Sequence, residues 1–139
     1  MSSIAKIFGA KALIYLKTNL DIQELSEVLA KGLMLTGIDL EADEYPPHEV
    51  SGSCEALGFE LWLEQSTDIL GLPYLLKIET EDCLSESFKD QMHDLSPWLA
   101  RYVSKICEID SFIPYTEDHK GLLFTKGEAS EVDIHDLIE

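Results

Sequence analysis

The chain has 139 residues, of which 27 are Asp or Glu and only 10 are Lys or Arg, so its formal net charge is −17. Hydrophobic residues make up 45% of the chain, which indicates a folded core and excludes a disordered acidic tail protein. A negative charge of this size opposes compaction and repels phosphates. It therefore disfavours nucleic acid and anionic membranes as partners.

The length predicts a single domain over residues 1–139. Its three cysteines are odd in number and form no CxxC motif, so a disulfide framework and a cysteine zinc site are both disfavoured. This cysteine usage is typical of a protein in the reducing cytoplasm. The N-terminus has no signal-peptide pattern, and no apolar run approaches the roughly 20 residues that cross a bilayer. Most of the negative charge lies in residues 41–95, which hold 14 acidic side chains and two lysines.

The first third of the chain predicts one strand and one helix. Residues 11–17 form a short apolar and aromatic run between two lysines, which is typical of a buried strand. Asp21 and Glu24 have the spacing of a capping box, and an apolar residue recurs every three or four positions after them. Residues 38–53 contain two prolines and several acids, so we expect a long loop there.

Two strands are predicted in the middle of the chain. Apolar and polar side chains alternate over residues 57–64 and again over residues 74–81. Only the Gly- and Pro-containing residues 66–73 separate these two segments, so we expect them to pair in an antiparallel manner.

The last third predicts helix and then strand. An apolar stripe with helical spacing runs from Phe88 to Ile106 and includes Met92. Pro97 interrupts it, so either the helix kinks or Ser96 caps a second helix, and we favour the cap. Residues 112–115 and 121–125 then suggest two strands. The acidic segment 128–139 either frays as a flexible tail or docks as a short helix.

This order of elements predicts an α+β fold. We expect a single antiparallel or mixed sheet of four to five strands with two or three helices packed on one face, in the split βαβ, ferredoxin-like order. In such a layout the second face of the sheet has no helical cover.

The sequence offers no pattern for catalysis, a cofactor or a metal ion. The four histidines lack the spacing of metal ligands, and no nucleophile elbow or phosphate-binding glycine motif occurs. Cys83 lies beside acids that suppress thiolate formation, and packed, inert thiols are expected here. We therefore predict a protein that is not an enzyme and needs no cofactor.

What remains is a surface for binding another protein. Trp62 is flanked by glutamates on the wet face of its strand, and Trp is a favoured interface anchor. Acidic rims steer a basic partner towards such an anchor. The alternative is that Trp62 packs beneath the C-terminal segment and that the acids only solvate the face. The predicted partner-binding residues are Glu41, Asp43, Glu44, Tyr45, Glu49, Glu60, Trp62, Glu64, Glu79, Glu81 and Asp82.

In size, acidity, cysteine usage and lack of a catalytic motif, the chain resembles in type the immunity proteins of bacterial toxin systems. That resemblance implies a cytoplasmic inhibitor that occludes a basic toxin domain, often a nuclease, with carboxylates in place of nucleic-acid phosphates. Three alternatives stay open: a nucleic-acid-mimicking inhibitor of a DNA-binding protein, a small-ligand-binding or enzymatic α+β domain, and a structural subunit of an assembly.

Overall fold

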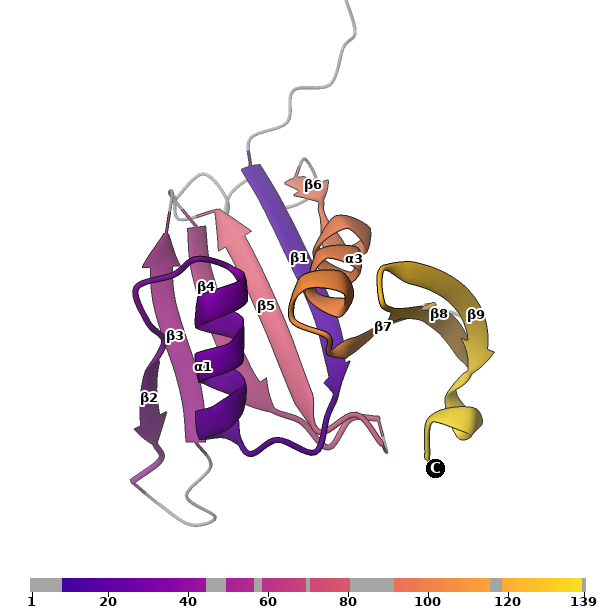
Figure 1. Cartoon of the computed structure of the whole chain (residues 1–139), viewed down its shortest axis with the longest axis horizontal. Helices are drawn as coiled ribbons and strands as arrows, with labels where there is room; N and C mark the ends of the chain where they lie inside the picture. Colours follow the sequence, from indigo (N-terminus) through magenta and orange to yellow (C-terminus); the bar gives the residue numbers. More distant parts are fainter. Residues whose placement is uncertain are drawn as a thin grey trace, which may run out of the picture.

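The computed structural model describes residues 9–44, 50–56, 59–69, 71–80, 92–115 and 119–138. Within them, nine strands form one sheet, accompanied by two helices of 11 residues and a short 3-10 helix (Figure 1). The helices are α1 (Ile22–Gly32), α3 (Ser96–Ile106) and the 3-10 helix η2 (Ile134–Ile138). The strands are β1 (Gly9–Lys17), β2 (Asp39–Ala42), β3 (Val50–Ala56), β4 (Phe59–Gln65), β5 (Tyr74–Thr80), β6 (Met92–Asp94), β7 (Asp110–Pro114), β8 (Lys120–Thr125) and β9 (Glu128–Asp133).

The sheet has the order β2-β3-β4-β5-β1-β7-β8-β9, with the first strand of the chain near its centre. Neighbours along this order are antiparallel, and β6 pairs in parallel with the start of β1. The predicted α+β class is confirmed, as is the antiparallel pairing of β4 with β5. The predicted ferredoxin-like order of four to five strands is wrong.

The sequence pattern missed four strands: β2 and β9 at the two edges of the sheet, β3 next to β2, and β6 beside the start of β1. The expected loop 38–53 holds β2 and the start of β3, and the prolines at positions 46 and 47 fall between these strands. Most side chains of β2 and β9 are exposed, so neither strand shows the alternation that marks a half-buried strand. β6 has only three residues, too few for any periodic signal, and its Met92 does not belong to a helix.

Helix α1 begins where the sequence predicted. The Asp21 carboxylate accepts the Glu24 N–H at 2.8 Å, and the Glu24 carboxylate accepts the Asp21 N–H at 3.3 Å, which completes the capping box. Leu25 and Leu29 are fully buried, so the predicted apolar face of this helix is the one that packs on the sheet.

Helix α3 begins differently from the expectation. Pro97 does lie in its first turn, but Ser96 is the first helical residue and not the cap. Its backbone N–H and hydroxyl both donate to the Asp94 carboxylate, at 2.9 and 2.6 Å. The same hydroxyl accepts the Leu13 N–H at 2.9 Å, so it fills the gap along β1 between β6 and β7. Burial raises the pKa of Asp94, but the hydrogen bonds from Ser96 and the nearby Lys11 outweigh it and leave that pKa lowered.

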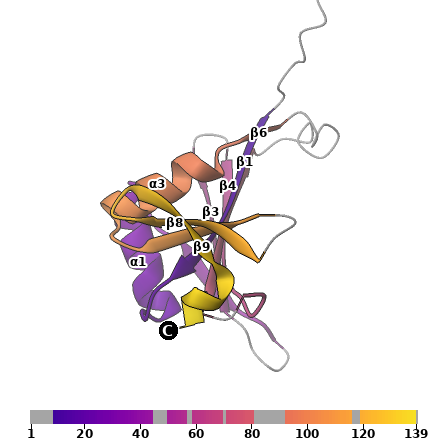
Figure 2. The same cartoon turned by 90° about the vertical axis from the view of Figure 1, so that its right-hand side faces the viewer.

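Both helices cover the same face of the sheet, as Figure 2 shows with the strands β1 and β4 seen near their edges. The main core lies between them and the sheet. Ile14, Leu63, Leu76, Leu99 and Val103 are at most 1% exposed there, and they come from three strands and α3. Within the described residues, no helix is long and apolar enough to cross a membrane.

A second, smaller core covers one end of the opposite face. Phe112 of β7 packs there with Leu72, from the β4–β5 connection, and with Leu137 of η2, all three at most 2% exposed. Residues 128–138, whose fraying or docking the sequence left open, form β9 and η2 and bring Leu137 to this core. Over β3, β4 and β5, the described residues place no helix on that face (Figure 2).

Candidate interaction surface

The antiparallel registers line up the side chains of the uncovered face into cross-strand rows. The first row joins Glu55 of β3, Glu60 of β4 and Glu79 of β5, and it ends at Lys11 of β1. Three carboxylates on adjacent strands stand directly opposite one another. Like charges in that position destabilise a sheet, so the pairs Glu55–Glu60 and Glu60–Glu79 work against folding, and Lys11 opposite Glu79 offsets part of that cost.

The second row carries the aromatic side chain of this face. Trp62 of β4 stands between Ser53 of β3 and Lys77 of β5. The Lys77 ammonium lies over the indole, 5.3 Å from the ring centroid, and also pairs with Glu79 at 3.8 Å. Trp62 is therefore half-buried and is covered by a lysine, whereas the C-terminal segment packs around Phe112.

The third row mixes acids with apolar side chains. It runs from Glu41 of β2 through Ser51 and Glu64 to Leu75 of β5, and then to Tyr15 of β1. Leu13 of β1, opposite Lys77 in the second row, is 41% exposed. The face therefore combines carboxylates with an apolar strip over β5 and β1.

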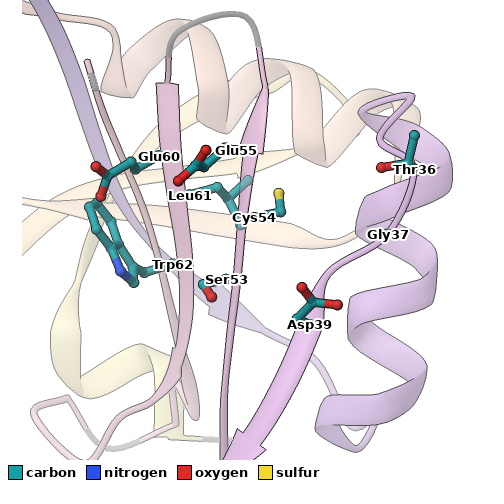
Figure 3. Close-up of a pocket in the computed structure, with 9 residues that line it drawn as sticks. All are labelled: Thr36, Gly37, Asp39, Ser53, Cys54, Glu55, Glu60, Leu61 and Trp62. Atoms are coloured by element: carbon teal, nitrogen blue, oxygen red, sulfur yellow. The ribbon is translucent and has the colours of Figure 1, made fainter. Parts of the chain in front are cut away.

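An open cleft of about 500 Å³ lies beside the Glu60 end of this face (Figure 3). It forms because β2 pairs with β3 only as far as Ser53, so the edge of β3 beyond that point has no strand paired to it among the described residues. In Figure 3, Glu60 and Trp62 project from β4 on the side away from α1, and Cys54 points towards the α1 side. The residues that line the cleft are Thr36, Gly37, Asp39, Ser53, Cys54, Glu55, Glu60, Leu61 and Trp62.

The cleft has little capacity for nucleophilic chemistry. Burial, and secondly the charge of Asp39, raise the pKa of the Cys54 thiol. The thiolate is the reactive form, so a raised pKa makes Cys54 a poor nucleophile. Burial raises the pKa of Cys107 in the same direction. Among the described residues, no group of three or more His, Cys, Asp and Glu side chains is placed to hold a metal ion.

A second cavity, of about 290 Å³, opens between the sheet and the two helices. Its walls are almost entirely apolar and include Phe59, Ile78 and Leu99, with the 60% exposed Trp98 at its rim. A site for a small ligand or for catalysis needs convergent polar groups in its lining. The described lining has one charged residue, Lys11, so it does not provide them.

The structure brings together five of the predicted partner-binding residues. Glu41, Glu60, Trp62, Glu64 and Glu79 all lie on the uncovered face. Asp43 and Glu44 are exposed just beyond the end of β2. The remaining four, Tyr45, Glu49, Glu81 and Asp82, lie outside the described residues.

Sequence reasoning missed Glu55 and Asp39 on this face. Asp39 lies on β2, which the sequence analysis predicted to be part of a loop. Glu55 lies on β3 in a segment to which the sequence analysis assigned no element. The alternation of Ser51, Ser53 and Glu55 with Gly52 and Cys54 carried the signal for β3. It is a weak signal because its inward residues are small.

Comparisons of the chain with protein-family models, with curated proteins and with solved structures gave no match.

Proposed function

We propose that this protein binds a basic protein partner through the uncovered face of β3, β4 and β5 and thereby blocks the partner's working surface. The observation that carries the proposal is the row Glu55–Glu60–Glu79, because it brings three carboxylates face to face at a cost to stability. A cationic partner would turn that repulsion into attraction and would also associate faster.

Trp62 would be the anchor of this contact. Its indole already accepts a cation from within the chain, because Lys77 lies over it at 5.3 Å. An arginine of the partner would replace Lys77 on the ring, since a guanidinium both stacks on indole and pairs with carboxylates. Glu60 and Glu64 flank Trp62 on the same face of β4 to receive that charge, and Glu79 already pairs with Lys77.

The biological role would be that of an immunity protein, acting in the cytoplasm to occlude a basic toxin domain. A nucleic-acid mimic is less well supported, because it needs regularly spaced anions and little apolar contact. On this face the acids lie beside Trp62 of β4 and beside an apolar strip that includes Leu75 and the 41% exposed Leu13. This mixture is typical of a protein–protein interface with a polar rim.

The test is affinity capture with the whole chain as bait. We expect a protein with a strongly basic sequence to be retained from a lysate of the source organism at low salt and released at high salt. The double variant Glu60→Lys/Glu64→Lys should lose that protein. Once purified, the captured protein should lose its own activity when an equal amount of the chain is added.

The matched control is Glu27→Lys/Glu108→Lys, which changes the net charge by the same amount at exposed sites on α1 and after α3. It should retain the partner. Equal loss from both double variants would show that only total charge matters. Capture that survives Glu60→Lys/Glu64→Lys would contradict the proposed surface.

A further inference from the structure

The fold brings together two histidines that are far apart in the sequence. His119 lies just before β8 and His135 lies in η2, 16 positions further along the chain. Their imidazole ring centroids are 6.0 Å apart, with the ring planes inclined at 38°. Both side chains are exposed.

Short hydrogen bonds fix the backbone on both sides of this pair. The Ile134 N–H donates to the His119 carbonyl at 2.7 Å, and the His135 N–H donates to the Asp133 carboxylate at 2.9 Å. The pairing of Lys120 with Asp133 in the β8–β9 ladder lies next to them. The two imidazoles therefore start from anchored positions and are not carried on separate loops.

The spacing of the rings suits a shared metal ion. Two imidazoles bound tetrahedrally to one Zn²⁺ through bonds of about 2.1 Å hold their ring centroids roughly 5.3 Å apart. The observed 6.0 Å is close to that separation, and rotation of two exposed side chains is enough to close the difference. Imidazole suits Zn²⁺, Cu²⁺ and Ni²⁺, and the acidic chain attracts cations in general.

We propose that His119 and His135 form a two-histidine site for a divalent transition metal ion, with Zn²⁺ as the representative ion. The described residues supply no third ligand at this site, so water completes the coordination shell. The bound ion links the start of β8 to η2, and η2 carries Leu137 into the small core around Phe112. Metal binding therefore stabilises the covered end of the face and is independent of the proposed partner surface.

The experiment is a titration of the full chain with ZnCl₂, followed by calorimetry and by thermal unfolding. We expect one ion to bind per chain and to raise the unfolding temperature. Replacing either ligand, as His119→Ala or His135→Ala, should weaken Zn²⁺ binding by at least about tenfold. Loss of a residue that only supports a metal ligand already weakens metal binding by about that factor, and loss of the ligand itself should cost no less. The matched control is His93→Ala, which removes another exposed histidine, on β6, and should bind Zn²⁺ like the wild type.

A second measurement locates the ion directly. Paramagnetic Ni²⁺, added below stoichiometric amounts, should broaden the NMR signals of His119 and His135 and spare those of His93. Three outcomes would overturn the proposal: Zn²⁺ affinity that survives both substitutions, equal stabilisation by Mg²⁺, or broadening spread over the carboxylates of β3 and β4. Far-UV circular dichroism of the two variants checks that the exposed substitutions leave the fold intact.

Discussion

The face of the sheet opposite α1 and α3 is divided into two parts with different character. Over β7 and the end of β1 it is covered by a small core of Leu72, Phe112 and Leu137, all at most 2% exposed. Over β3, β4 and β5 it carries a row of three glutamates and the half-buried Trp62. Both parts belong to one continuous sheet, so the contrast lies in the side chains and in what the chain places over them.

Within the described part of the chain, apolar cover for this face is concentrated at one end. The β4–β5 connection and η2 bring apolar residues to Phe112, whereas the Trp62 ring lies beneath the ammonium group of Lys77. An acidic surface with an aromatic at its centre is poorly explained by folding alone, because its cross-strand glutamates oppose pairing. The proposed binding of a basic partner would account for this surface.

The largest predicted effect is at the covered end of this face. Phe112→Ala should lower the free energy of unfolding by about 3–5 kcal/mol, because it removes a fully buried aromatic ring and leaves a cavity beneath η2. Urea unfolding followed by circular dichroism measures the loss. A loss below about 1 kcal/mol would mean that this small core does not hold the C-terminal segment in place.

The matched substitution at the open end is Trp62→Ala. We expect it to lower the free energy of unfolding by about 1–3 kcal/mol, less than Phe112→Ala, because the indole is only partly buried and loses that burial together with its cation–π contact with Lys77. The same substitution should abolish capture of the basic partner. If it destabilised the fold as much as Phe112→Ala, Trp62 would be a core residue and could not serve as the anchor.

How far the sequence predicts this molecule depends on which side chains each element buries. The capping box at Asp21 and the alternation in β4 could be predicted because each depends on residues close together in the sequence. The same alternation placed Glu60, Trp62 and Glu64 on one face of β4. The register of β4 with β5 puts Lys77 and Glu79 on that same face, opposite Trp62 and Glu60, as the sequence predicted.

The parts that escaped prediction are those set by long-range pairing. β2 and β9 are edge strands with exposed side chains, so their pairing partners and not their own residues define them. The sequence predicts Ser96 as a helix cap, yet its hydroxyl accepts a hydrogen bond from the N–H of Leu13, 83 positions away in the sequence. The row of three glutamates could not be foreseen because its member Glu55 lies on β3, whose small inward residues hide the pattern.

The smallest predicted effect is that of Glu60→Gln, which should stabilise the fold and weaken partner binding. Glu60→Gln removes the central charge of the glutamate row, so it should raise the free energy of unfolding by roughly 0.2–1 kcal/mol at low salt. The gain should shrink at high salt, where exposed charges are screened. Glu27→Gln, on the exposed surface of α1, is the control and should change stability by less than about 0.5 kcal/mol.

The same Glu60→Gln variant should bind the basic partner more weakly than the wild type, although it is more stable. If Glu60 served only solubility, its replacement would leave partner binding unchanged, and stability and binding would not change in opposite directions. Urea unfolding at two salt concentrations, together with the capture assay, measures both quantities on one protein. A variant that is destabilised, or that binds as well as the wild type, would remove the electrostatic basis of the proposed surface, because the glutamate row would then neither strain the sheet nor attract a partner.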